Sequence, residues 1–158
     1  MISKKIENGI KGNINIPSDK SISHRSIIIP SISMGISEIN NLLMSDDVMH
    51  TLHAFKTLGV KIEDSNDKII IYGKGLNSLK KPNKNIYLGN SGTSARLLTG
   101  LLASQTFETI LEGDKSLSSR PMARIMDPLK LMGAEFENVS GTLPLKIIGK
   151  KLTKSKIE

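Results

Sequence analysis

The fold is decided by the stretch Leu52-His53-Ala54-Phe55-Lys56-Thr57-Leu58-Gly59-Val60-Lys61-Ile62-Glu63, which the chain repeats as Met126-Asp127-Pro128-Leu129-Lys130-Leu131-Met132-Gly133-Ala134-Glu135-Phe136-Glu137. In each copy, apolar residues at helical spacing precede a glycine, and an alternating apolar stretch follows it. A glycine just past such a pattern is typical of a helix C-terminus. Each copy therefore predicts a helix that ends near the glycine and leads into a strand.

Two further pairs of segments recur in the same order along the chain. Ser23-His24-Arg25 corresponds to Ser94-Ala95-Arg96, and Tyr72-Gly73-Lys74 corresponds to Ile148-Gly149-Lys150. Isolated matches of Gly and Lys are common, but an ordered series is not. The series indicates two copies of one supersecondary unit.

Each copy predicts the same β-α-β-α-β-β order, and the two copies together predict an α/β fold. The expected strands are 14–16, 38–42, 86–88 and 108–111, the expected helices are 23–33, 45–58, 93–104 and 120–132, and the expected hairpins join 60–63 to 68–72 and 134–137 to 145–148. We expect Ser45, Asp46 and Asp47 to cap the second helix. Pro121 suits a first helical turn, and Pro128 predicts a local kink.

Composition limits the class of protein. The chain has 158 residues and 38% apolar residues, enough for one domain or for a large part of a two-domain protein. It has no Cys, which excludes disulfides, thiolate metal sites and cysteine nucleophiles. The start of the chain does not resemble a secretory signal, and the longest apolar runs are too short to span a bilayer. We therefore expect a soluble cytoplasmic protein with no membrane contact.

The formal net charge of +7 allows three interpretations: a nucleic-acid partner, a solvated Lys-rich surface, or small anionic substrates. Aromatic residues make up only 3% of the chain, so stacking on bases is disfavoured. From charge alone a solvated surface is favoured, and we expect no nucleic-acid partner. A nucleic-acid binder would instead bind duplex DNA with a steep salt dependence.

Three short segments combine small or hydroxyl residues with an arginine. They are Pro17-Ser18-Asp19-Lys20-Ser21-Ile22-Ser23-His24-Arg25, Leu88-Gly89-Asn90-Ser91-Gly92-Thr93-Ser94-Ala95-Arg96 and Gly113-Asp114-Lys115-Ser116-Leu117-Ser118-Ser119-Arg120-Pro121-Met122. Each follows an apolar stretch and precedes an expected helix, where free backbone N–H groups and the helix dipole attract anions. Together they predict a site for a ligand with more than one negative group.

Each segment also has a purely structural interpretation. The first could be an ordinary capped helix start, or Ser21, Arg25 and Lys20 could bind a phosphate or carboxylate. Gly92 could serve a tight turn or a close approach of backbone to ligand. Arg120 could be a solvated residue before a helix-starting proline. The chain contains neither a nucleotide P-loop nor a dinucleotide-binding fingerprint.

The histidines do not predict a metal site. His50 and His53 are three residues apart on one expected helix, but the sequence offers no third ligand. We interpret both, and His24, as ordinary helix surface.

Taken in order, the three motifs resemble those of the enolpyruvyl transferases, in the branch that acts on shikimate 3-phosphate. The resemblance runs from about Ile10 to Gly149. It implies a two-domain fold of repeated β-α-β-α-β-β units, the inverted α/β barrel type, of which this chain holds an incomplete part. It also implies transfer of the enolpyruvyl group of phosphoenolpyruvate (PEP) to the 5-hydroxyl of shikimate 3-phosphate, with release of phosphate.

The resemblance assigns roles residue by residue. Lys20 would contact both substrates and act in catalysis. The residues implied to bind shikimate 3-phosphate are Lys20, Ser21, Arg25 and Thr93. Those implied to bind PEP are Lys20, Asn90, Gly92 and Arg120. Arg96 would contact the anion or support the glycine loop from behind. No metal or organic cofactor is implied, and the partners would be these two small molecules, bound by a monomer when the protein is full length.

The chain also departs from the family pattern. Ser18 stands where glycine is common and Ala95 where Met is frequent, and the family's chains are much longer. We expect residues 1–15 to belong to the other domain, 16–82 and 83–153 to form two units, and 154–158 to begin a third. The 158 residues alone are expected to be inactive.

Two alternatives share these loops. The sister transferases that act on UDP-N-acetylglucosamine generally have a Cys in this half and Lys-Asn in the first motif, whereas this chain has no Cys and reads Lys20-Ser21. A non-catalytic anion-binding module would keep the same three segments.

Overall fold

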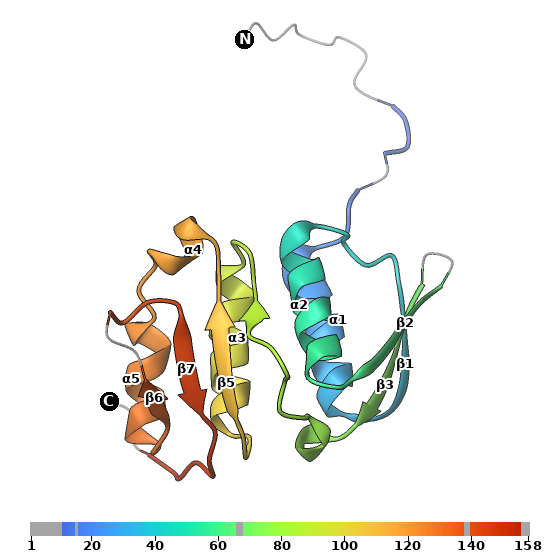
Figure 1. Ribbon diagram of the computed structural model, residues 1–158. Coiled ribbons are helices and arrows are strands. Elements are labelled where there is room, and N and C mark those ends of the chain that lie inside the picture. The colour runs from blue at the N-terminus through green and yellow to red at the C-terminus, as the bar shows by residue number, and fades with distance from the viewer. Residues whose placement is uncertain (1–10, 15, 66–67, 138–139, 156–158) are drawn as a thin grey trace, which may run out of the picture.

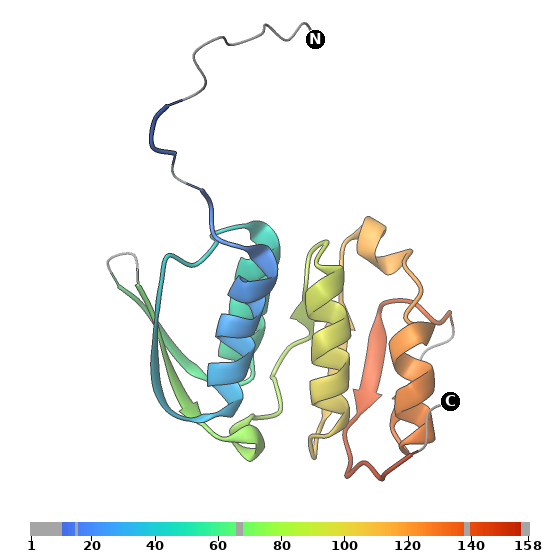
Figure 2. The ribbon, with the colours of Figure 1, turned by 180° about the vertical axis from the view of Figure 1, so that it is seen from behind.

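The computed structural model describes residues 11–14, 16–65, 68–137 and 140–155, which form two units lying side by side (Figure 1). In each unit, helices cover one face of a small sheet (Figures 1 and 2). The expected α/β class is confirmed.

The first unit runs through α1 (Lys20–Ile32), β1 (Met34–Asn40), α2 (Asp46–Thr57), β2 (Lys61–Ser65), β3 (Lys68–Lys74) and the short 3-10 helix η1 (Leu76–Ser78). Its sheet is antiparallel with the order β1-β3-β2. Alternation along β3 buries Ile69 and Ile71, whereas Ile70 and Tyr72 lie on the less buried face. The helices fill the covered face with side chains such as Phe55 of α2.

The second unit runs through β4 (Ile86–Tyr87), α3 (Gly92–Ala103), β5 (Glu108–Glu112), α4 (Lys115–Ser118), α5 (Ala123–Leu131), β6 (Glu135–Glu137) and β7 (Leu145–Ile148). Its sheet has the order β4-β5-β7-β6, with β4 parallel to β5 and the other pairs antiparallel. The order β5-β7-β6 repeats the order β1-β3-β2 of the first unit. In the described residues, no helix has the length and apolar character needed to cross a membrane.

The two copies of the deciding stretch end their helices in the same way. Gly59 and Gly133 have φ values of +86° and +91°. The Val60 N–H donates to the Phe55 carbonyl at 3.0 Å, and the Ala134 N–H donates to the Leu129 carbonyl at 2.9 Å. This is the Schellman pattern, in which glycine adopts the left-handed conformation at low cost. The predicted repeat is therefore confirmed at the level of hydrogen bonds.

A second matched pair of glycines lies where a hairpin strand crosses the end of a helix. A Cβ on Gly73 would overlap the carbonyl oxygens of Pro30 and Ser33, at the end of α1. A Cβ on Gly149 would lie 2.6 Å from the carbonyl oxygens of Gln105 and Phe107, just after α3. Only glycine lets the strand and the helix end approach this closely.

The expected strand at 14–16 is wrong for the residues that can be described. Ile14 and Ile16 have no strand structure and are 81% and 75% exposed, and residue 15 lies outside the described part of the chain. A strand needs a hydrogen-bonded neighbour, and β1 pairs only with β3 among the described strands. The second unit has β4 in the corresponding place.

The helix expected at 120–132 also needs correction. The structure has a separate four-residue helix, α4, capped by the Asp114 carboxylate, which accepts from the Leu117 N–H at 2.7 Å. Helix α5 then begins only at Ala123. At the start of α2, Ser45 occupies the cap position but makes no capping bond, and its buried hydroxyl has no partner in the described residues.

The two units meet through α2, which packs against α3 and β4. Four buried polar side chains cross this junction. His24 Nδ1 lies 2.8 Å from Thr51 Oγ1, Thr51 Oγ1 lies 2.6 Å from Ser94 Oγ, and Ser94 Oγ lies 2.6 Å from Ser91 Oγ. We call this set the junction chain. It joins α1, α2 and the N-terminus of α3.

The interpretation of His24 as helix surface is wrong, because its side chain is 1% exposed. It lies on the face of α1 that also carries Ser23 and Ile27 and turns inward. Burial lowers the pKa of His24, the nearby positive charge of Lys20 lowers it further, and Asp47 partly opposes both. The neutral imidazole is thus the favoured form in the folded chain.

We predict that Gly149→Ala lowers the free energy of unfolding, measured by urea denaturation, by about 1–3 kcal/mol, because the new methyl overlaps two carbonyl oxygens. The matched control is Gly100→Ala in α3, where an added Cβ meets nothing within 4 Å. Alanine favours a helix, so this control should leave stability unchanged or raise it by up to about 1 kcal/mol. Equal effects of the two substitutions would contradict the crowding argument.

A pH dependence follows from His24. The folded pKa lies below the ordinary value of 6.5, so stability from the neutral ring is complete above pH 6.5 and is lost as the pH falls through the folded pKa. We expect urea unfolding between pH 7.5 and pH 5 to show a smaller loss of stability in His24→Asn, which does not titrate, than in the parent chain. His53→Asn, an exposed control, should keep the parental loss. Identical pH profiles of stability for all three chains would refute His24 as the cause of the pH dependence.

Candidate functional site

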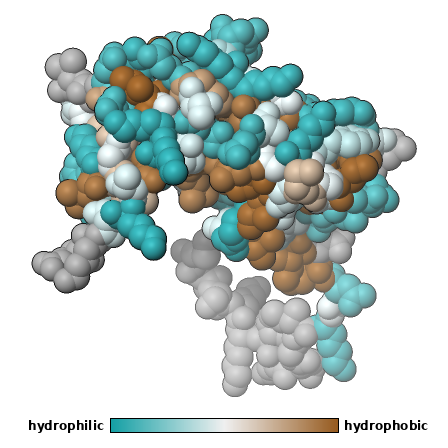
Figure 3. Space-filling view, turned by 90° about the horizontal axis from the view of Figure 1, so that it is seen from below, coloured by the Kyte–Doolittle hydropathy of each residue, from teal (hydrophilic) through white to brown (hydrophobic). Residues whose placement is uncertain are grey.

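Helices α1, α2 and α3 all begin at the upper edge of the molecule (Figure 1). Each helix runs downward from there, so the partial positive ends of three helix dipoles gather at one edge. The opposite end, seen from below, is a surface of interspersed hydrophilic and hydrophobic residues (Figure 3). Most of the residues assigned by the sequence motifs belong to the upper edge.

The start of α1 holds the first motif. Asp19 caps the helix, with its carboxylate accepting from the Ile22 N–H at 2.7 Å. The Lys20 ammonium donates to the Asp47 carboxylate at the start of α2, so these two helix ends are joined by an ion pair. Ser21 and Arg25 are exposed, and no side-chain hydrogen bond or ion pair involves either of them among the described residues.

The start of α3 holds the second and third motifs together. The Arg120 guanidinium donates to the Asn90 side-chain oxygen, and its Nη2 lies 3.4 Å from Ser116 Oγ. Both acceptors are neutral, so no carboxylate in the described ranges compensates the charge of Arg120. A guanidinium in this state can bind an anion with two parallel hydrogen bonds.

Gly92 lies against two arginine side chains. A Cβ on Gly92 would be 2.9 Å from Arg96 Nη1 and 3.0 Å from Arg120 Nη1. Arg96 donates to the Gly92 carbonyl at 3.1 Å and to the Pro121 carbonyl at 3.4 Å. Arg96 therefore joins the glycine loop to the segment after α4 and supports that loop.

The structure thus places the predicted residues in two clusters. Asn90, Gly92 and Arg120 are in contact at the start of α3, and Lys20 lies with Asp47 at the starts of α1 and α2. Thr93 is exposed on the first turn of α3. The junction chain connects the two clusters through buried side chains.

Sequence reasoning missed several contributors. Asp47 was interpreted only as a helix cap, whereas its carboxylate pairs with Lys20. Ser116 belongs to the third motif, where the sequence alone assigns it no function, and it lies beside Arg120. A signal for the junction chain was available: Ala95 takes the place of His24 in the second copy, and a position that accepts Ala in one copy is often buried.

The other histidines have different surroundings. His53 is exposed, as expected, whereas His50 is half-buried and packs edge-on against the Tyr87 ring at 5.5 Å between ring centroids. The His50 ring also occupies the space that a Cβ on Gly89 would need. Within the described ranges, no group of three or more His, Cys, Asp or Glu side chains is placed to hold a metal ion.

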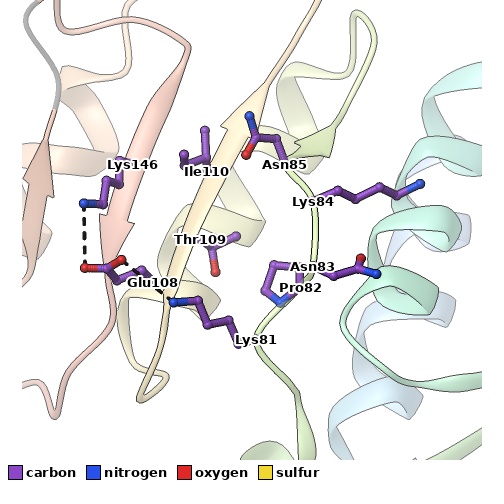
Figure 4. A pocket seen from close by; sticks show the side chains of 9 residues that line it. All are labelled: Lys81, Pro82, Asn83, Lys84, Asn85, Glu108, Thr109, Ile110 and Lys146. Atoms are coloured by element: carbon purple, nitrogen blue, oxygen red, sulfur yellow. Dashed lines mark ion pairs between the residues drawn. The ribbon is translucent and has the colours of Figure 1, made fainter.

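A separate hollow of about 150 Å³ lies between β5 and the segment that connects the two units (Figure 4). Glu108 in this hollow pairs with Lys146 at 3.7 Å and with Lys81 at 4.0 Å. Lys84 points away from it, toward the helices of the first unit. The hollow contains none of the residues assigned by the motifs, and its principal charges already pair with each other.

Comparison with known proteins agrees with the motifs. The family model described as EPSP synthase (3-phosphoshikimate 1-carboxyvinyltransferase) matches residues 4–158. A 3-phosphoshikimate 1-carboxyvinyltransferase from Vesicomyosocius okutanii is 53% identical over 142 residues, which cover 90% of this chain and 33% of the relative. One from Oenococcus oeni is 51% identical over 142 residues, covering 89% of this chain and 32% of the relative.

The fold gives the same result. The solved structure of EPSP synthase from Acinetobacter baumannii matches with a TM-score of 0.87 and 43% sequence identity, over 92% of this chain and 33% of that one. The chain therefore spans about a third of the length of the relatives it matches. With its motifs, its repeated fold and this match over residues 4–158, the chain belongs to the EPSP synthase family.

Proposed function

We propose that this chain carries one part of a site that transfers the enolpyruvyl group of PEP to the 5-hydroxyl of shikimate 3-phosphate and releases phosphate. The supporting observation is that Arg120 lies beside Gly92 and that its guanidinium, among the described residues, is bonded only to neutral oxygens. An uncompensated guanidinium beside a glycine and a helix N-terminus is suited to a small, multiply charged anion.

In this proposal PEP lies against the start of α3. Arg120 binds an anionic group of PEP, Asn90 orients the guanidinium, and Gly92 leaves room for the ligand. Shikimate 3-phosphate lies at the start of α1, where Ser21 and Arg25 are exposed and without side-chain partners in the described structure. Thr93 faces this second substrate from the first turn of α3.

Lys20 would contact both substrates. The addition step forms a bond between the 5-hydroxyl oxygen and C2 of PEP, removes the hydroxyl proton and places a proton on C3. The elimination step removes a proton from C3 and expels phosphate. A cation stabilises the negative charge that phosphate carries away, and the Lys20 ammonium is held near its place by Asp47.

Three further expectations belong to the same proposal. Residues 1–15 would be part of the other domain, while 16–82, 83–153 and 154–158 would be successive units of this one. The full-length protein would be a cytoplasmic monomer. The 158 residues alone would not convert the substrates, because about two thirds of the length of the relatives lies outside the matched region.

The test is a chimera in which residues 1–158 replace the matching third of the Oenococcus oeni relative, assayed for phosphate release. We expect activity that needs both substrates. Arg120→Ala should raise KM for PEP, and Arg25→Ala should raise KM for shikimate 3-phosphate, each by roughly 10- to 100-fold, because a charge-assisted bond is lost.

The matched control is Arg124→Ala, which removes an exposed arginine of α5 outside both clusters. Its kinetic constants should equal those of the parent chimera. A non-catalytic anion-binding module would give a chimera that binds the substrates without releasing phosphate, and that result would refute the proposal.

Gly92→Ala gives a sharper prediction about the PEP position. The added methyl meets the terminal nitrogens of Arg96 and Arg120 and must displace at least one of them. We expect a higher KM for PEP and a nearly unchanged KM for shikimate 3-phosphate in steady-state kinetics of the chimera. Gly100→Ala in the same helix is the control. If Gly92→Ala altered both substrates equally, or stability alone, PEP should not be placed against this loop.

A further inference from the structure

The junction chain is a deeply buried polar feature that the proposed reaction does not use. Ser91, Ser94 and Thr51 are 0% exposed and His24 is 1% exposed. Their successive polar atoms are 2.6, 2.6 and 2.8 Å apart, which are distances of well-formed hydrogen bonds. The junction chain runs from Ser91 in the second unit to His24 in the first.

Three hydroxyl groups and one imidazole nitrogen satisfy one another along the chain. Each of the three links needs one proton, and the three hydroxyls supply three. If neutral His24 accepts at Nδ1, the donors run from Ser91 through Ser94 and Thr51 to the ring, and if Nδ1–H donates, the order is reversed. The other ring nitrogen, His24 Nε2, is buried without a partner in the described residues. The Ser94 N–H also donates to Ser91 Oγ at 3.4 Å. Loss of any one hydroxyl therefore leaves a buried partner without its bond, which is costly.

The two end members of the junction chain, Ser91 and His24, are neighbours in sequence of residues in the two clusters. Ser91 separates Asn90 from Gly92, at the loop assigned to PEP. His24 precedes Arg25 and lies one helical turn from Lys20, at the end of α1 assigned to shikimate 3-phosphate. The middle member, Thr51, is one turn from Asp47, the ion-pair partner of Lys20.

We propose that the junction chain is a positioning link, with Thr51 as its central positioning residue, that sets the spacing between the PEP end of α3 and the shikimate 3-phosphate end of α1. The inference rests on the proposed function. Joining two bound substrates requires their reacting atoms to be placed to within a fraction of an ångström, and misplacement by 1 Å can cost about 100-fold in rate. Short hydrogen bonds between small side chains fix one arrangement of the helices, whereas apolar contacts alone allow sliding.

The first experiment needs no activity. The sequence contains no Cys, so Ile22→Cys on α1 and Leu97→Cys on α3 create two unique sites for nitroxide labels. Both positions are open to labelling, with 57% and 47% exposure. Double electron–electron resonance on the 158-residue chain then reports the distribution of distances between the two helices.

Thr51→Val keeps the shape of the side chain and removes its hydroxyl, and Thr51→Ser keeps the hydroxyl. We expect Thr51→Val to shift or broaden the distance distribution and Thr51→Ser to restore the parental one. Ser94→Ala removes the same hydrogen bond from the other side and should reproduce the effect of Thr51→Val. It replaces Thr51→Val in the test if that variant folds poorly. A parental distribution in both Thr51→Val and Ser94→Ala would overturn the proposal.

The matched control is Thr99→Val. Thr99 is also 0% exposed, but its hydroxyl donates to the Ala95 carbonyl of its own helix at 2.7 Å, so it does not cross the junction. Thr99→Val should leave the label distances unchanged. An equal disturbance by Thr99→Val and Thr51→Val would assign the effect to general core packing and overturn the proposal.

The second experiment measures kinetics in the chimera. Thr51→Val should bind each substrate within about two-fold of the parent and lose roughly 10- to 100-fold in kcat, because the substrates are misplaced relative to each other. Thr51→Ser should rescue kcat. An unchanged kcat in Thr51→Val would overturn the positioning role. An inactive parent chimera would instead refute the proposed function, and the label distances would still decide whether the link exists.

Discussion

The close crossing of a hairpin strand over the end of a helix is the constraint from which the rest of the arrangement follows. At Gly73 the backbone lies against carbonyl groups at the end of α1, and at Gly149 it lies against carbonyl groups in the turn just after α3. This contact fixes the lower ends of α1 and α3 to their sheets. The upper ends of the helices must then gather at the opposite edge, where the free N–H groups and the motif residues lie. Crowding at one end of each unit therefore leaves the free N–H groups and the motif residues together at the other.

The charges at that edge differ in how far they are compensated. The ammonium of Lys20 is paired with a carboxylate, whereas the guanidinium of Arg120 is bonded only to neutral oxygens as far as the structure describes the chain. Arg25 has no side-chain partner in the part of the chain that is described. Among the described residues, an arriving anion thus finds guanidinium groups without a carboxylate partner on both units, Arg25 on the first and Arg96 and Arg120 on the second. This distribution favours two anionic ligands bound side by side, in agreement with the two-substrate reaction proposed.

Sequence patterns predicted the features that depend on local chemistry. Glycine at 59 and at 133 marked the helix ends correctly, because positive φ values favour glycine. Features that depend on distant partners could not be predicted. Residues 14 and 16 have strand-like side chains, but no described strand lies beside them. Helix α4 is too short to show periodicity. The burial of His24 depends on which face of α1 meets α2, and one helical pattern does not specify that face.

The junction between the units is polar, and polar contacts give it a directionality that an apolar junction would lack. Leu or Val side chains between α2 and α3 would contribute more burial energy, but their contacts are not directional and tolerate small shifts of one helix along the other. Thr51 and Ser94 are small, so the helices approach closely, and their hydroxyls must meet within hydrogen-bond distance or remain unsatisfied. The junction therefore exchanges some stabilisation for a single register. That register matters most at the upper edge, where the separation of Gly92 from Lys20 would determine whether two bound substrates can react.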